Sequence, residues 1–238
     1  MGTIINVIGI IIGGLLGLFF GGKLKDKYQT SLISVCGLSS MFIGISGTLS
    51  SMFTVSNGKI NSNGTMMAII CLTLGCVIGE LLGIEDKLEA LGEWLKIKTK
   101  SEKDNSFVNA FVTASLTVCI GAMAIVGSIQ DGIWGDSSTL VAKAILDLII
   151  VMVFAASLGK GAIFSALPVL VLQGSVTLLA KFIEPLMTEA ALTNLSITGN
   201  MLIFCVGINL IWPGKFKVAN MLPGIILAVI WSFLPINI

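Results

Sequence analysis

Long apolar segments separated by short polar connections recur along the whole chain. Each is close to the roughly 20 residues that an α-helix needs to cross a hydrocarbon core about 30 Å thick. The pattern predicts eight membrane-spanning helices, at residues 3–22, 31–54, 64–84, 107–129, 138–158, 162–183, 196–212 and 217–236. We therefore expect an all-α, polytopic membrane protein whose residues 1–238 form a single integral membrane domain.

The longest polar interruption, residues 85–105, predicts a helix of another kind. Its apolar side chains share one helical face, and charged side chains occupy the opposite face. The apolar face consists of Leu88, Leu91, Trp94 and Leu95. A helix of this kind lies in the plane of the membrane interface. We interpret the segment as a cytoplasmic amphipathic insertion that anchors the chain to the membrane surface.

Glycines at a spacing of four form smooth faces on two of the predicted spans. Small residues at this spacing let helix backbones approach closely in lipid, where no hydrophobic effect drives helix association. The candidates for helix packing are Gly13, Gly17 and Gly21 in the first span, Gly75, Gly79 and Gly83 in the third, and Gly121 and Gly127 in the fourth.

The spans with glycine faces also begin two similar stretches of sequence. Each is followed by a charged segment and then by a span in which Cys and Gly fall eight residues apart, at 36–44 and at 119–127. This predicts an internal repeat of a two-helix unit, 3–55 against 64–130. The seventh span resembles these spans in the opposite direction, either as an inverted repeat or by chance.

Composition agrees with a membrane protein and removes most enzyme chemistry. Hydrophobic residues make up 55% of the chain and charged residues 11%, and the mean hydropathy is +1.00. The sequence has no His and no Arg, and its five Cys lie in apolar runs without metal-ligand spacing. We expect no enzyme, no cofactor and no metal site. A net charge of +1, without a basic patch beyond the loops, argues against a nucleic-acid partner.

The lysines predict the orientation in the membrane. If the N-terminus is outside, the inner connections hold eleven of the fourteen lysines. The bias of basic residues toward the cytoplasm therefore favours both termini outside. The first segment lacks the positive region of a signal peptide, so we expect it to be retained. Lysine as the only basic residue, with abundant isoleucine, suggests an AT-rich bacterial genome.

Lys143 and Asp147 stand inside the fifth predicted span. A charge at the centre of a spanning helix costs roughly 2.5–3.5 kcal/mol on insertion scales, so each needs a partner or a function. Four residues apart on a helix, they share a face and can neutralise each other. Lys143 is nearer the outer end, where snorkelling also explains it. Asp147 lies near the midplane and is the candidate for a solute or ion path.

Two further spans combine a polar side chain with a proline. Gln173 shares the sixth span with Pro168, and Asn220 shares the eighth with Pro223. Proline removes a backbone hydrogen bond, so each span is expected either to kink or to form a discontinuous helix beside a binding site. Asp131 and Asp136 fall in the predicted outer turn at 130–137, where turn chemistry or attraction of cations explains them.

Several short sequences resemble one bacterial family along the whole chain. They are TIIN with GGLLG at 3–17, GAMAIVGSIQDG at 121–132, LD with SLGKG at 146–161, LQGSVTLLA at 172–180 and KVANMLPG at 217–224. The chain resembles the inner-membrane proteins called domain of unknown function 554, which are labelled predicted transport proteins. The resemblance implies a multi-span fold and supplies no substrate or site residue.

The sequence therefore favours a secondary transporter or permease for a small solute, proton- or cation-coupled through Asp147. We expect Asp147, Gln173, Asn220 and Lys143 near its path. Two alternatives remain open: a membrane scaffold whose glycine faces bind a partner or a second copy, and an ion channel. The expected partners are membrane lipids, a small solute or ion, and further copies in a homo-oligomer.

Overall fold

The computed structural model describes residues 1–21, 26–56, 58–102, 104–120 and 122–234. The regular secondary structure of its described part is helical except for one antiparallel hairpin. Strand β1, Phe53–Ser56, pairs with β2, Lys59–Ser62, in the register Phe53↔Ser62. The hairpin joins the second predicted span to the third.

In the described residues, all eight predicted spans are helical over most of their length. The longer helices are α1 (Gly2–Gly21), α2 (Asp26–Met52), α3 (Thr65–Leu82), α4 (Ile84–Lys98), α5 (Phe107–Cys119), α6 (Ala122–Trp134), α7 (Ser138–Leu158), α8 (Ala166–Leu178) and α10 (Glu189–Ile211). The shorter ones are η1 (Lys160–Ser165), α9 (Ala180–Ile183), η2 (Glu184–Leu186), α11 (Val218–Met221) and α12 (Pro223–Trp231).

Within the described ranges, six segments are long and apolar enough to cross a membrane as single helices. They are α1, most of α2, α3, α7, η1 with α8, and α10. Helices α5 and α6 together make a seventh, bent by 61°, and the shorter apolar pair α11 and α12 occupies the eighth position. The prediction of an all-α polytopic membrane protein is confirmed, but the fourth predicted span, 107–129, is two helices where one was expected.

Helix α1 packs against α7 through its glycines. A Cβ built on Gly13 would overlap the carbonyl oxygen of Leu148, and one on Gly21 would meet the backbone of Ala156 at 2.6 Å. Gly17 lies against the α7 backbone in the same way. Residue numbers rise together along this contact, so α1 and α7 run in the same direction, as the first and fifth of eight alternating spans must.

Gly75 and Gly79 of α3 pack in the same manner, and Gly83 does not. A Cβ on Gly75 or Gly79 would overlap the backbone of α12 and α11 at Gly224 and Asn220, respectively. Gly83 ends α3 with a φ of 59° and begins α4. Its predicted packing role is wrong, because a backbone conformation that favours glycine is needed there to turn the chain.

The other predicted packing glycines lie in the fourth span. Gly127 of α6 contacts α7, where a Cβ would meet the Leu140 side chain at 2.9 Å. Gly121 lies outside the described residues. Helices α2 and α10 pack antiparallel, with Gly44 against Phe204 and Gly37 against Ile211.

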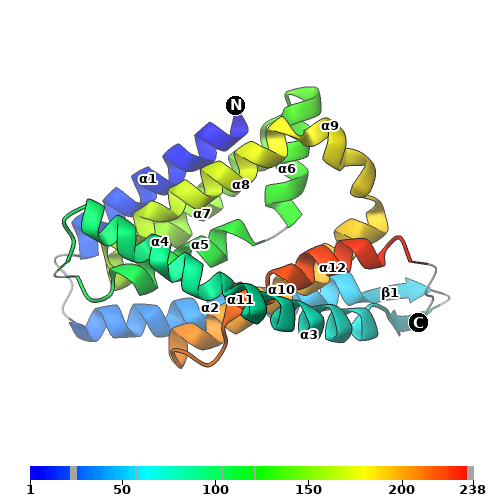
Figure 1. The fold of residues 1–238 in the computed structure, drawn as a ribbon, viewed down its shortest axis with the longest axis horizontal. Helices are drawn as coiled ribbons and strands as arrows, with labels where there is room; N and C mark the ends of the chain where they lie inside the picture. The colour runs from blue at the N-terminus through cyan, green and yellow to red at the C-terminus, as the bar shows by residue number, and fades with distance from the viewer. Residues whose placement is uncertain (22–25, 57, 103, 121, 235–238) are drawn as a thin grey trace.

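Figure 1 shows two layers of helices, one containing α1, α7 and α8 and the other α2, α3, α10 and α12. Helix α5 joins them, because opposite faces of it enter different parts of the core. Ala114 and Val118 pack with Val151 and Ile10. On the opposite face, Val112 and Leu116 belong, with Phe111, to the cluster that includes Leu202 and Val218.

Helix α4 differs from the predicted surface anchor. Leu95 is only 6% exposed, and Leu88 and Leu91 pack against the same cluster as Phe111. Trp94 is 55% exposed, so the predicted apolar face divides. Its leucines cover α5, and its tryptophan points away from the core.

The two candidate repeats differ in structure. Helix α2 continues through the region that corresponds to the break between α5 and α6. Helix α1 packs parallel to α7, whereas α3 packs antiparallel to α12. The internal repeat stays a prediction.

Candidate functional site

The break in the fourth span places a charged side chain against a helix end. Helix α5 ends at Cys119, and Ile120 is extended, with a ψ of 125°. Carbonyl groups in the last turn of a helix lack intrahelical partners. The Lys143 Nζ of α7 donates a hydrogen bond to one of them, the Val118 oxygen, at 2.8 Å. This lysine therefore stabilises the negative end of the α5 dipole.

Lys143 also pairs with Asp147. Its Nζ lies 2.5 Å from Asp147 Oδ2, and the two residues are only 7% and 3% exposed. Lys143 is therefore paired and buried, and it does not snorkel. Because removal of one member leaves a buried charge uncompensated, the two side chains depend on each other.

Two amide side chains complete a cluster that we call the polar centre, made of Asn6, Lys143, Asp147, Gln173 and the Val118 carbonyl. Asn6 Nδ2 donates to Asp147 Oδ2 at 3.0 Å and to Gln173 Oε1 at 3.2 Å. Asn6 Oδ1 and Gln173 Nε2 are buried without a hydrogen-bond partner among the described residues. Such groups are rare in folded proteins and call for a physical reason.

The glycine face of α1 explains how Asn6 reaches α7. Asn6, Gly9 and Gly13 recur on one helical face, and a Cβ on Gly9 would meet the Ala144 carbonyl oxygen at 3.0 Å. Asn6 is not among the path residues predicted from the sequence. Its place on the glycine face of the first span was the only signal in the sequence, and the helix that this face contacts is given by the structure.

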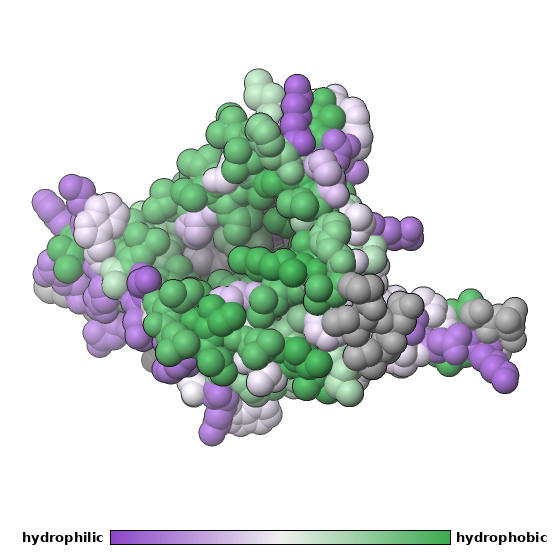
Figure 2. All heavy atoms as spheres, turned by 45° about the vertical axis from the view of Figure 1, so that its right-hand side comes forward, coloured by the Kyte–Doolittle hydropathy of each residue, from purple (hydrophilic) through white to green (hydrophobic). Residues whose placement is uncertain are grey.

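A cavity of about 270 Å³ adjoins the polar centre. Its polar lining residues are Thr117, Lys143, Asp147, Ser196 and Asn200, and its apolar ones are Ile120, Met123, Ala124, Leu146, Ile150 and Ile203. They come from α5, α6, α7, α10 and the connection at the break. The face of the molecule turned forward in Figure 2 is hollowed near its middle and is largely hydrophobic around the hollow.

A second cavity of about 350 Å³ continues along α7. It shares Thr117, Ile150 and Ile203 with the first and extends to Val35 and Phe154. Its walls come from α2, α5, α7 and α10. The two cavities are therefore neighbours along α7, between the helix layers.

Asn220 lies in a different cluster from the polar centre. Its Nδ2 donates to Glu80 Oε2 at 2.5 Å, and its Oδ1 accepts from the Glu85 N–H at 2.7 Å. Glu85 Oε2 in turn accepts from the Ala219 N–H at 2.8 Å. Helices α4 and α11 thus cap each other, and the prediction that Asn220 lines the path with Asp147 is corrected to a role in joining helices.

An ion pair joins the end of α3 to the start of α11 at this junction. Lys217 Nζ lies 2.6 Å from Glu80 Oε1, and this hydrogen bond raises the pKa of Lys217 above its ordinary value. Burial raises the pKa of the Glu85 carboxyl, although hydrogen bonds to the α11 backbone act in the opposite direction.

The prolines interrupt one span and not the other. Pro168 lies in the first turn of α8, where the missing N–H costs little, and α8 continues to Leu178. Pro223 begins α12 one residue after α11 ends at Met221, and Leu222 between them keeps a helical conformation. The eighth span is therefore interrupted only locally there.

The two acidic residues of the predicted outer turn have separate roles. Asp131 lies within α6 and is buried, where it accepts hydrogen bonds from the Met1 nitrogen at 2.8 Å and the Gly2 N–H at 3.0 Å. Its assignment to a turn is wrong, because α6 extends to Trp134. Asp136 accepts from the Ser138 N–H at the start of α7, which holds the pKa of Asp136 below its ordinary value.

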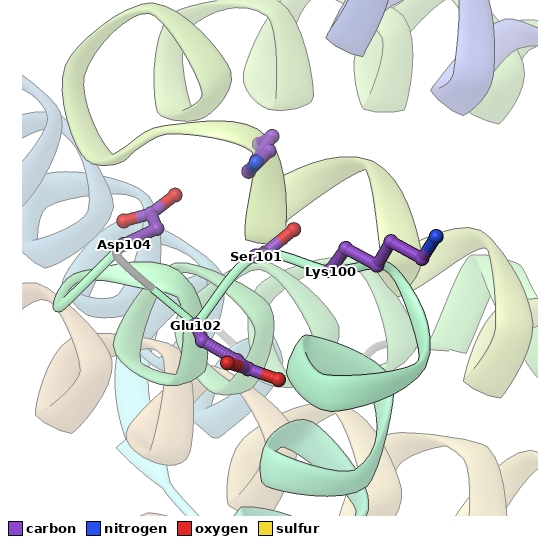
Figure 3. A pocket seen from close by; sticks show the side chains of 5 residues that line it. Lys100, Ser101, Glu102 and Asp104 are labelled. Atoms are coloured by element: carbon purple, nitrogen blue, oxygen red, sulfur yellow. The ribbon is translucent and has the colours of Figure 1, made fainter.

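A larger surface pocket lies in the connection between α4 and α5. It has a volume of about 870 Å³ and is lined by Lys100, Ser101, Glu102, Asp104 and Lys160. Figure 3 shows that Lys100, Glu102 and Asp104 point in different directions. The pocket offers no convergent set of groups. Across the described ranges, no three His, Cys, Asp or Glu side chains are grouped to hold a metal ion.

Comparison with known proteins places the chain in a family. The model of a family described as "Protein of unknown function (DUF554)" matches residues 1–233. The chain belongs to the DUF554 family. The resemblance inferred from its motifs is therefore confirmed.

Two relatives match almost end to end. The chain is 28% identical to the Uncharacterized protein YqgA of Escherichia coli (strain K12), over 96% of this chain and 94% of that protein. It is also 28% identical to the Uncharacterized membrane protein YdfK of Bacillus subtilis (strain 168), over 98% of this chain and 95% of that protein. No solved structure matches. The second relative and the apolar helices of this DUF554 protein agree on a membrane location.

Proposed function

We propose that the protein is a secondary transporter or permease that moves a small solute across the bacterial inner membrane. Coupling occurs at Asp147 and Lys143, and the cavity beside them takes the solute. The observation that carries the proposal is the buried ion pair that touches both a broken spanning helix and a cavity.

The chemistry of the pair supports coupling. A buried charge in a spanning helix is expensive and usually marks a polar path. Protonation of Asp147, or a solute group that bonds to Lys143, removes part of the attraction that holds Lys143 in place. Lys143 also holds the end of α5, so such an event changes the energy of the break between α5 and α6. Discontinuous helices at a binding site serve transporters in this way.

The cavity constrains the solute. A volume of about 270 Å³ lies just below the range of roughly 300–1,000 Å³ typical of drug-sized ligands. Thr117, Ser196 and Asn200 offer hydrogen-bonding groups, and Lys143 and Asp147 offer one charge of each sign. These properties favour a small polar solute.

The scaffold alternative requires glycine faces that another molecule can reach. These faces carry Gly13 and Gly17, or Gly75 and Gly79. Within this chain those glycines already face α7, α11 and α12. A homo-oligomer therefore requires other surfaces.

We also propose that both termini lie outside the cell membrane. The parallel contact of α1 with α7 and the antiparallel contact of α2 with α10 agree with eight alternating spans. Inner connections then hold most lysines. Labelling a single cysteine at Ser137, in a background without other cysteines, distinguishes the two orientations. Reaction of this cysteine with an impermeant reagent added from the cytoplasmic side excludes the orientation with both termini outside.

A ligand screen tests the transporter proposal. Purified protein is melted in the presence of free amino acids, short carboxylates, monosaccharides and nucleobases. A solute that fits the cavity stabilises the wild type by linkage, and Asp147→Asn weakens the response. Asp136→Asn serves as a matched control, because Asp136 is exposed at the start of α7. Equal responses of Asp147→Asn and the wild type to every stabilising solute contradict the proposal.

A further inference from the structure

A file of buried and half-buried polar side chains leads from Asp147 toward the start of α1, on a different side from the cavity. Asn6 bonds to both Asp147 and Gln173. Thr3 lies three residues before Asn6, and Thr177 four residues after Gln173, so each shares a helix face with its neighbour. Thr3 Oγ1 and Thr177 Oγ1 are 3.3 Å apart.

The file ends at a second buried acid. Gly132 of α6 lies so close to α8 that a Cβ there would overlap the Thr177 carbonyl oxygen. The residue before it, Asp131, accepts the Gly2 N–H at 3.0 Å, and its side chain is 2% exposed. Helices α1, α6 and α8 thus place Asp131 at one end of the file and Asp147 at the other.

We propose that this file, made of Asp131, Thr3, Thr177, Asn6 and Gln173, is the route by which protons reach Asp147. The inference rests on the proposed function and identifies its coupling ion as a proton. The solute uses the cavity lined by Asn200, and the proton uses the file.

The unpaired amide atoms support a route for water-borne protons. Asn6 Oδ1 accepts hydrogen bonds and Gln173 Nε2 donates them, and both are buried without partners among the described residues. Together they suit a water molecule, which needs polar partners of both kinds. Amide and hydroxyl groups hold the water, and a hydronium ion passes its proton to the Asp147 carboxylate, which becomes neutral and leaves water behind.

The geometry favours a proton over a metal cation. The Lys143 ammonium already takes the position that a cation would occupy, between the Val118 oxygen and the Asp147 carboxylate. Along the file, the Thr3 and Thr177 hydroxyls are within hydrogen-bonding distance of each other. This spacing leaves no room for a hydrated ion.

The charges around Asp147 are compatible with proton uptake. On elements packed against α7, the charged side chains described are Lys27 of α2, Asp131 of α6 and Lys160 of η1. Lys27 is exposed and precedes the span, and Lys160 follows α7. The Cys119 thiol also faces the pair from α5. At the other end of the file, the Met1 ammonium lies 2.8 Å from Asp131 Oδ2, and α9 carries Lys181, which is exposed.

Infrared spectroscopy of the full-length protein in liposomes tests the route without a solute. The band of the protonated Asp147 carboxyl is assigned by its loss in Asp147→Asn, and its rate of appearance is followed after a drop in external pH. Thr177→Val and Gln173→Leu should each slow this rate about tenfold, the effect of one lost hydrogen bond on a barrier. Thr177→Val nearly keeps the shape of threonine, so the test remains valid if Gln173→Leu fails to fold.

Two further variants, one in a hydroxyl outside the file and one in the cavity, show whether the effect is specific to the file. Thr198→Val removes a buried hydroxyl of α10 that bonds only within its own helix, and it should leave the rate unchanged. If both file variants protonate Asp147 at the wild-type rate, the route is overturned. It is also overturned if only Asn200→Leu slows the protonation, or if Asp147 does not become protonated. If the file variants slow the protonation of Asp147 but no solute in the ligand screen stabilises the protein, the transporter proposal fails and the proton route stands.

Discussion

Lys143 of α7 donates a hydrogen bond to the backbone oxygen of Val118, 2.8 Å away, in the last turn of α5. A break in a spanning helix exposes carbonyl groups that lipid cannot satisfy. Here a lysine that is also paired with Asp147 provides the partner. The charge state of one side chain is thereby linked to the conformation of a broken helix.

The pair should show strong mutual dependence. Lys143→Met removes the ammonium that neutralises Asp147 and donates to the Val118 carbonyl, and we expect it to destabilise the protein by about 3–5 kcal/mol. The double variant with Asp147→Leu should cost less than the sum of the single changes. Thermal melting followed by tryptophan fluorescence measures each effect. Lys96→Met, which breaks the more exposed pair with Glu93, should cost less than about 1 kcal/mol. Strict additivity at Lys143 and Asp147 would show that the two side chains do not interact.

The contact between α1 and α7 should not tolerate a side chain at Gly13. A Cβ there overlaps the Leu148 carbonyl oxygen, so Gly13→Ala forces the helices apart and should cost about 1–3 kcal/mol. Gly174 of α8 is the matched control, because a Cβ at that position meets nothing within 4 Å. Gly174→Ala should melt at or slightly above the wild-type temperature. Similar melting of both variants is the result that this packing does not allow.

Asn220 should affect stability without affecting solute recognition. Asn220→Ala removes the cap of α4 and a partner of Glu80, at an expected cost of about 1–2 kcal/mol. Its melting temperature should fall, but the same solutes should still stabilise it. Normal melting together with loss of the solute response would return Asn220 to the path.

The ion pair of Lys217 and Glu80 should make stability depend on alkaline pH. Glu80 raises the pKa of Lys217 above 10.5, so the stabilisation is complete below that pH and is lost as pH rises through the folded-state pKa. The difference in melting temperature between wild type and Lys217→Gln should therefore hold from neutral pH to about 10 and then close. Lys215→Gln is the control, because Lys215 forms no ion pair with a described residue. A difference that persists unchanged into strongly alkaline solution contradicts this assignment.

The sequence predicted the helices and the location of the polar centre for simple physical reasons. Hydrophobic length is enough to place spans, and the cost of a charge in lipid is enough to single out Lys143 and Asp147. Gln173 was included because it shares a span with a proline, and the structure brings it to Asn6. That proline, Pro168, lies at the start of its helix, so the reason for selecting Gln173 was incidental to its position.

The parts that were missed depend on contacts between distant segments. The break after Cys119 was not apparent, because hydrophobicity continues across it. Asn220 and Glu80 are 140 residues apart in sequence, and nothing local indicates that they meet. Asn6 was recognisable only once the glycine face of α1 was matched to α7, and that pairing required the structure.

Proton movement in liposomes tests the central claim most directly. Protein is reconstituted with a pH-sensitive dye inside, and a solute that stabilises the wild type in the ligand screen is added outside. The wild type should change the internal pH when the solute is added. Liposomes reconstituted with Asp147→Asn should contain folded protein and show no change in internal pH. Equal proton movement by wild type and Asp147→Asn would contradict coupling at Asp147.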